Sequence, residues 1–274
     1  FFEEEMAKAV RERARVEDAL RTAITTGRIH AVYVPAVELA SQRVVGFEAV
    51  PRWTDPRLGS VPPERFLPIA QEIGLIHELA AGLLREAAGL ALHWPPQVTL
   101  SIDVFPGQFT DPQLARRIGG ILQESGLPAQ RLELEITESS LVQNPAAAQT
   151  ALGQLRALGV KIALDNFGTG YASLSHLCHF KVDKVKIDRS FIESMQAGQD
   201  GGNIVSALIG LGRGLGLTLA AEGVDDSLRR ALLVGTGCEQ GQGQWFSEPV
   251  AAEQTLQLVA AAEEQRVEEQ RAAG

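Results

Sequence analysis

Acidic side chains recur at the ends of short apolar runs along this sequence. The acids that end these runs are Glu48, Asp103, Glu135, Asp165, Asp188 and Glu222. A lysine, Lys186, stands two residues before Asp188. If the runs are parallel strands of one barrel, their carboxyl ends share one face and bring these carboxylates together. Crowded carboxylates repel one another unless cations lie among them, and an all-oxygen ligand set favours Mg²⁺ or Mn²⁺ over zinc.

Each acid alone is also compatible with a solvated side chain or a helix N-cap, but chance rarely ends so many apolar runs with an acid. Two classes of enzyme fit the whole set. One is a metal-assisted phosphodiester hydrolase, and the other is an enolase-like barrel whose acids and lysine stabilise an enediolate. A second cluster, His176, Cys178 and His179, lies in a predicted surface turn without a matching second ligand pair, which favours a structural role.

The elements that must position these acids follow a regular alternation. Residues 31–39 and 43–50 are β-branched runs on either side of a turn-like Ala-Ser-Gln, which predicts an antiparallel hairpin. Further strands are predicted at 97–103, 131–136, 160–165, 182–188, 217–222 and 238–243. Helices are predicted at 62–94, 111–126, 144–159, 201–215 and 225–236. This rhythm over roughly 245 residues predicts an α/β fold of the (β/α)₈ TIM-like barrel class, with an open doubly wound sheet as the alternative.

Composition narrows the classes of protein that fit. The chain has 274 residues, 45% hydrophobic and 22% charged, which is typical of a globular domain. Its 25 basic and 34 acidic side chains give a net charge of −9, which argues against a nucleic-acid polymer as partner. The sequence contains no apolar run of about 20 residues, so we expect no direct membrane insertion of this fragment. Two cysteines make no disulfide framework, and a cytoplasmic location is the simplest expectation.

The first 26 residues differ from the rest of the chain. They are charge-dense and free of proline, and their apolar side chains include Met6, Val10, Leu20 and Ile24. This spacing predicts an amphipathic helix over 1–26 that ends near Gly27. We expect it to connect an upstream domain to a barrel domain over 27–262, followed by a charged tail over 263–274. The alternative is a first helix that packs on its own domain.

Six ordered motifs resemble one known family. The context of Glu48 is VVGFEAVPRW, and it is followed by PPERFLPIAQEIGLI, LELEITES, ALDNFGTGYASLSHL, VDKVKIDRSFI, AAEGV and GCEQGQGQWFSEP. In order and spacing these resemble the EAL domain, the family that hydrolyses the bacterial messenger cyclic di-GMP, over roughly residues 30–250. The resemblance implies a (β/α)₈ barrel whose first strand is antiparallel to the others. It also implies a metal-dependent phosphodiesterase that yields linear pGpG.

The resemblance assigns roles to individual side chains. It implies two Mg²⁺ or Mn²⁺ ions per site, held at Glu48, Asp103, Glu135, Asp165, Asn166 and Glu222. The residues expected to be catalytic are Lys186, which holds the attacking water, with Glu48 and Glu222. Those expected to bind substrate are Arg52, Gln242, Asp188 and Asp225. Glu138 is expected to steady the loop 166–173.

Two positions depart from the family pattern. The family's asparagine ligand is Asp103 here, and the second aspartate of its DDFGTG loop is Asn166. Together they exchange one amide and one carboxylate, so the six expected ligand positions still hold five carboxylates, which makes the exchange a compensation. The alternative is a non-catalytic cyclic di-GMP receptor with a degenerate metal site, which Asn166 favours because an amide bridges two cations less well.

The resemblance also implies partners. Residues 1–26 resemble the segment that joins a GGDEF domain to an EAL domain, so we expect an upstream GGDEF or sensory domain in the full-length chain. Family members often pair, which predicts a homodimer. A cytoplasmic domain of this kind is compatible with membrane attachment of the full-length protein.

Overall fold

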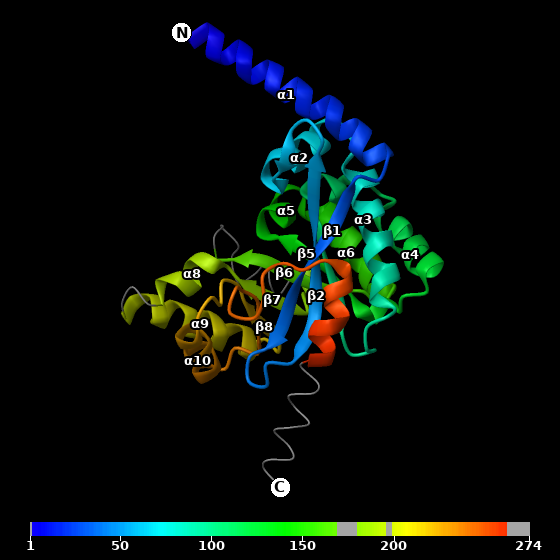
Figure 1. The fold of residues 1–274 in the computed structure, drawn as a ribbon. Coiled ribbons are helices and arrows are strands. Elements are labelled where there is room, and N and C mark those ends of the chain that lie inside the picture. Colours follow the sequence, from blue (N-terminus) through cyan, green and yellow to red (C-terminus); the bar gives the residue numbers. More distant parts are fainter. Residues whose placement is uncertain (1, 169–179, 196–198, 262–274) are drawn as a thin grey trace.

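The structure is a computed structural model that describes residues 2–168, 180–195 and 199–261 (Figure 1). The predicted cluster of His176, Cys178 and His179, the loop positions 169–173 and the tail 263–274 lie outside the described residues. No helix of the described part is long and apolar enough to cross a membrane.

Strands of the described chain close into a barrel (Figure 1). The barrel strands are β1 (Ile29–Glu38), β2 (Val44–Asp55), β4 (Thr99–Val104), β5 (Leu132–Thr137), β6 (Lys161–Phe167), β7 (Lys184–Ile187), β8 (Thr218–Ala221) and β9 (Gln240–Gly241). The first strand, β1, pairs antiparallel with both β2 and β9, and the other neighbouring pairs of the barrel are parallel. A short strand, β3 (Gly59–Val61), extends the far end of β2 as a hairpin. The predicted barrel with an antiparallel first strand is confirmed.

Helices cover the outside of the barrel (Figure 1). They are α2 (Pro63–Glu72), α3 (Ile76–Ala91), α4 (Leu114–Ser125), α5 (Glu138–Gln143), α6 (Pro145–Ala157), α8 (Arg189–Ser194), α9 (Gln199–Gly214) and α10 (Ser227–Thr236). A short 3₁₀ turn, η1 (Pro106–Thr110), follows β4, and a second, η2 (Ala129–Arg131), precedes β5. Residues 252–261 are also helical. The single helical segment expected at 62–94 is two helices, because Gly74 between them has a φ of 75°, a left-handed conformation that ends a helix.

The N-terminal helix α1 (Phe2–Thr25) packs on the barrel domain through the apolar side chains of its second half. Val16, Leu20 and Ala23 are buried, whereas Met6 and Val10 are 57% and 66% exposed. Arg13 of this helix pairs with Glu72 of α2. The predicted helix is therefore part of the domain from about its midpoint, and its first half extends away from the barrel (Figure 1).

Truncation of Leu20 tests this division of the helix. Because Leu20 is fully buried, Leu20→Ala should lower the free energy of unfolding by about 2–5 kcal/mol. Val10→Ala is the matched control on the same helix, and its exposed side chain predicts a change within about 0.5 kcal/mol. Urea unfolding curves measure both changes, and equal effects of the two substitutions would contradict the packing of α1.

Strand alternation separates an apolar outer face from a polar interior. Along β5, Leu134 and Ile136 face the helices and are buried in the hydrophobic core, while Glu133 and Glu135 are also buried and face the barrel axis. The same period of two holds along β7, where Val185 belongs to the core. Charged side chains therefore point into the barrel from β5 and from β7, the two strands that flank β6.

Candidate active site

Five of the six acids expected on one face converge inside the barrel, and the sixth, Asp188, instead caps α8. Four of them lie near or just past the end of their strands, whereas Glu48 lies in the middle of β2, which continues to Asp55 and not, as expected, only to about Glu48. The set comprises Glu48 on β2, Asp103 on β4, Glu135 on β5, Asp165 on β6 and Glu222 directly after β8. Lys186 of β7 and Gln242 after β9 point to the same place. The prediction that strand ends gather these side chains on one face agrees with this geometry.

Lys186 is the centre of the cluster. Its Nζ lies 2.5 Å from Glu135 Oε2, 2.8 Å from Glu222 Oε1 and 2.9 Å from Glu48 Oε2. It also lies 3.5 Å from Asp165 Oδ1, and its side chain is only 3% exposed. One buried ammonium thus contacts four carboxylates that come from four different strands or strand ends. Such an ammonium is held in a fixed position, as a group that orients a water molecule must be.

A set of carboxylate oxygens beside this lysine fits a hard divalent cation. One oxygen each of Glu48, Asp103 and Glu135 lies within 4.8 Å of the others. Gln242 Nε2 donates a hydrogen bond of 3.1 Å to Glu48 Oε2, which fixes the orientation of that carboxylate. Oxygen donors at such separations suit the coordination of Mg²⁺ or Mn²⁺ and not that of softer metals.

The cluster carries more negative than positive charge, and the pKa values reflect this. Burial, reinforced by the Glu48 carboxylate, raises the pKa of Asp103 to about 7. Burial and the same neighbour raise the pKa of Glu135, and burial raises that of Glu222. Burial alone would raise the pKa of Glu48 too, but contact with the Lys186 ammonium lowers it. Five carboxylates around one ammonium leave a charge that further cations would neutralise.

The exchanged pair, Asp103 and Asn166, occupies two distinct places. Asp103 contributes its carboxylate to the oxygen set described above. Asn166 has a φ of 54°, a conformation that asparagine adopts more readily than most residues, and its Nδ2 donates a 2.8 Å hydrogen bond to Asp165 Oδ2. The amide therefore orients a neighbouring carboxylate, and the carboxylate gained at Asp103 lies with the candidate ligands.

Of the four residues expected to bind substrate, Gln242 belongs to this cluster through its hydrogen bond to Glu48, whereas Arg52, Asp188 and Asp225 face solvent or other partners. Arg52 is exposed and stands four residues beyond Glu48 on the same face of β2. Asp188 caps α8 by accepting from Ser190 N at 2.9 Å. Asp225 accepts from Arg189 at 2.7 Å and from Gln244 N at 3.0 Å. Both aspartates thus have structural partners.

Glu138 begins α5 and is buried. Most of the loop that it was expected to steady lies outside the described residues, so this role stays a prediction.

The sequence patterns were not used to predict a buried ion pair that lies one layer below the Lys186 cluster. Glu133 Oε1 and Lys184 Nζ lie 2.7 Å apart, and both side chains are buried. They stand two residues before Glu135 and Lys186 on the same two strands. The alternation in Leu-Glu-Leu-Glu and Lys-Val-Lys was the signal that could have revealed them, because a period of two places both members of each strand on one face.

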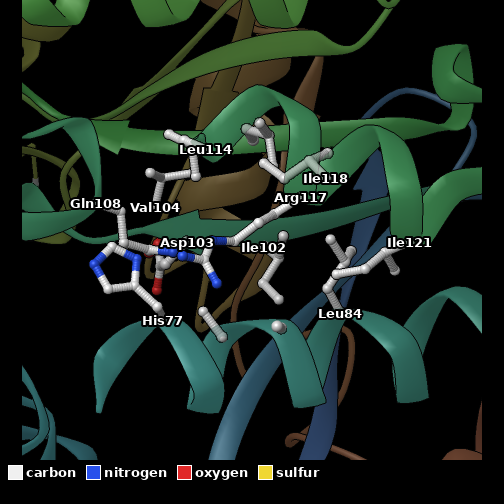
Figure 2. Close-up of a pocket in the computed structure, with 13 residues that line it drawn as sticks. His77, Leu84, Ile102, Asp103, Val104, Gln108, Leu114, Arg117, Ile118 and Ile121 are labelled. Carbon is white, nitrogen blue, oxygen red and sulfur yellow. The ribbon is translucent and has the colours of Figure 1, made fainter. Parts of the chain in front are cut away.

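A pocket on the outer side of β4 lies behind Asp103 (Figure 2). Ile102 and Val104, which flank Asp103 in the strand, line it together with side chains of α3 and α4. Figure 2 shows Leu84 and Ile121 at one end and His77 with Gln108 at the other. Apolar packing between these helices and β4 therefore fixes the strand that presents Asp103 to the barrel interior.

Comparison with known proteins agrees with this geometry. The profile of the EAL domain matches residues 17–249. A signaling protein of Caulobacter vibrioides is 40% identical over 249 residues, which cover 91% of this chain and 31% of that protein. Cyclic di-GMP phosphodiesterase RocR of Pseudomonas aeruginosa is 33% identical over 252 residues, which cover 90% of this chain and 64% of RocR.

A solved structure is also similar. The PaMucR phosphodiesterase in its c-di-GMP complex is 34% identical, with a TM-score of 0.84 over 88% of this chain and 100% of that chain. This chain spans about a third of the length of several curated relatives that it matches. The profile match over most of the chain, the ordered motifs and the barrel all lead to one assignment: the chain belongs to the EAL domain family.

Proposed function

We propose that this domain is a metal-dependent phosphodiesterase that hydrolyses cyclic di-GMP to linear pGpG. The observation that carries the proposal is the convergence of Glu48, Asp103 and Glu135 oxygens beside the buried Lys186 ammonium at the barrel mouth. The similarity to RocR and to the PaMucR phosphodiesterase supports the choice of cyclic di-GMP as substrate. An enolase-like reaction has no support of this kind.

The chain's own residues have separable tasks in this reaction. We assign two Mg²⁺ or Mn²⁺ ions to the carboxylates Glu48, Asp103, Glu135, Asp165 and Glu222, with Asn166 beside them. When bound, the metal polarises the phosphate and supplies a nucleophile at neutral pH. Lys186 donates a hydrogen bond that orients the attacking water. Glu222 is the most exposed of the carboxylates that Lys186 contacts, at 25%, so it is placed to exchange a proton at the mouth.

The reaction adds one water molecule across one P–O3′ bond. The hydroxide oxygen joins phosphorus, the 3′ oxygen leaves and takes a proton, and the product keeps a 5′ phosphate. Arg52 is assigned to the substrate phosphate or guanine because its guanidinium is exposed on the face of β2 that carries Glu48. Asp188 and Asp225 are assigned to the substrate rim, Gln242 to the substrate beside Glu48, and Glu138 to the loop that begins at Asn166.

A second function, a cyclic di-GMP receptor without catalysis, is favoured by one observation. The amide nitrogen of Asn166 donates a hydrogen bond to Asp165. The side chain of Asn166 therefore has one neutral oxygen as a possible cation ligand, where the family pattern has a charged carboxylate. A weaker second cation would leave nucleotide binding intact and slow the hydrolysis.

Metal removal and return separates the two functions. The protein is stripped with EDTA, incubated with cyclic di-GMP alone or with added Mg²⁺ or Mn²⁺, and the nucleotides are separated by chromatography. The phosphodiesterase predicts linear product only in the samples with returned metal. Nucleotide that binds but stays cyclic at every metal concentration would establish the receptor.

The exchanged pair gives a separate prediction. Asp103→Asn leaves four carboxylates and should weaken the second cation, while Asn166→Asp gives six and should raise acid–acid repulsion. Because the double change restores five, we expect it to recover at least the starting kcat/KM, with a coupling of about 0.5–3 kcal/mol between the two sites. The measurement is kcat/KM of the four proteins across a Mg²⁺ titration. Strict additivity at every metal concentration would reject compensation.

We propose that the extended half of α1 connects to an upstream GGDEF or sensory domain, that the domain forms a homodimer, and that it acts in the cytoplasm.

A further inference from the structure

A second layer of charge lies one step below the candidate metal ligands. Glu133 and Lys184 form a buried ion pair of 2.7 Å inside the barrel. They come from β5 and β7, and on the strand between them, β6, Ala163 lies opposite Lys184 and Lys161 lies opposite Glu133. Because Ala163 carries only a methyl group, it leaves space for the two long side chains to meet in front of β6.

Such a pair is an unusual filling for a barrel. Barrel interiors are normally packed by branched apolar side chains, and burying two charges costs solvation that their attraction seldom exceeds. An apolar layer would give similar or greater stability. The pair therefore calls for an explanation other than stability.

Lys184 is strongly attracted toward the layer above it. That layer holds five carboxylates and one ammonium, and the charge of Lys184 already contributes to lowering the pKa of Glu48. The lysine stem is flexible, and the two layers are separated by about 6.6 Å along the strand. A small cavity lined by Glu133, Glu135, Lys184 and Lys186 adjoins both layers. The Lys184 ammonium is therefore attracted to the upper carboxylates, its side chain is long enough to reach them, and the cavity gives it space to do so.

Glu133 is what opposes this movement. Within the described residues, Lys184 forms one ion pair, and its partner is Glu133. A second ammonium among Glu48, Asp103 and Glu135 would neutralise oxygens that a divalent cation needs, and it would repel the cation itself.

We propose that Glu133 is a positioning residue that holds the Lys184 ammonium in the lower layer and so keeps it out of the metal ligands. This inference rests on the metal site of the proposed function. In this proposal Lys184 is a potential competitor of the divalent cation for the carboxylates, and Glu133 restrains it. Lys186 is the ammonium that takes part in the proposed reaction.

Glu133→Met and Glu133→Met/Lys184→Met test the proposal. Mn²⁺ affinity is measured by titration calorimetry on the protein without nucleotide. Glu133→Met leaves Lys184 without its partner and should weaken Mn²⁺ binding by about tenfold or more. The double variant also removes Lys184 and should restore the Mn²⁺ affinity to within about threefold of the wild-type value. Unchanged Mn²⁺ affinity of Glu133→Met, or a double variant as weak as the single one, would overturn the proposal.

Two further readouts keep the result clear. Glu133→Gln keeps a weaker acceptor and should shift the affinity in the same direction by less, which covers a failure of the methionine variant to fold. A crystal structure of metal-free Glu133→Met should show Lys184 Nζ bonded to Glu48 or Glu135. Lys184 left in the lower layer would overturn the proposal. A wild-type protein that binds Mn²⁺ without hydrolysing cyclic di-GMP would reject only the proposed function, and the metal and crystal readouts would still decide the role of Glu133.

Discussion

Glu48→Ala should abolish hydrolysis of cyclic di-GMP while leaving the barrel folded. Glu48 belongs to the candidate oxygen set and accepts from both Lys186 and Gln242, so its loss removes a ligand and the partner of two orienting donors. Loss of an outer-shell partner alone typically costs 10–100-fold in metal affinity or activity, so we expect at least about a hundredfold loss of kcat/KM.

Stability should respond differently from activity. The alanine relieves repulsion among buried carboxylates, and Lys186 keeps three other acidic partners, so the urea midpoint should change little. Glu124→Ala, at an exposed carboxylate on α4, is the matched control and should leave both quantities unchanged. Loss of cooperative unfolding in Glu48→Ala would instead give Glu48 a structural role.

Lys186→Met has the second largest expected effect, and it acts on both activity and stability. As the group that orients the attacking water, Lys186 should contribute about 10²–10⁴-fold to kcat, with a smaller change in substrate binding. Its removal also leaves four carboxylates, of which Glu135 and Asp165 are buried, without their shared ammonium. Loss of one partner from a buried ion pair costs about 3–5 kcal/mol, which is the destabilisation we expect without metal.

Added metal should restore part of that stability. A cation that binds the folded state alone stabilises it by mass action, and the vacated carboxylates of Lys186→Met are free to bind one. Thermal unfolding with and without Mg²⁺ measures this recovery. Lys161→Met, at an exposed lysine of β6, is the control and should show neither loss nor recovery. An unchanged kcat in Lys186→Met would remove the lysine from the reaction.

The fold was largely predictable because its signals are local. The hairpin of β1 and β2 follows from two β-branched runs around a short turn, and the later strands and helices alternate at regular spacing. The break between α2 and α3 was missed, because apolar helical spacing continues on both sides of Gly74 and its positive φ is a tertiary outcome. The division of α1 was also hidden, since Val10 and Leu20 are equally apolar but only Leu20 meets the barrel.

The site was predictable at the level of strand ends but not at the level of contacts. Acids near the carboxyl ends of the parallel strands β4, β5 and β6 predict that Asp103, Glu135 and Asp165 share one face of the barrel. Which interior side chains meet across the barrel depends on strand stagger, and sequence spacing does not contain it. For this reason the four-carboxylate contact of Lys186 and the pair of Glu133 with Lys184 emerged only from the structure. The bond from Asn166 to Asp165 depends in the same way on one local dihedral angle.

Hydrolysis in water labelled with heavy oxygen tests the central claim most directly. The metal-loaded protein is incubated with cyclic di-GMP in labelled water, and the nucleotides are analysed by mass spectrometry beside a Glu48→Ala sample. Metal-dependent attack of water on phosphorus predicts linear pGpG that carries one labelled oxygen in its 5′ phosphate, with none formed by the variant. Cyclic di-GMP recovered intact and unlabelled from a protein that binds it would contradict the phosphodiesterase and establish a receptor.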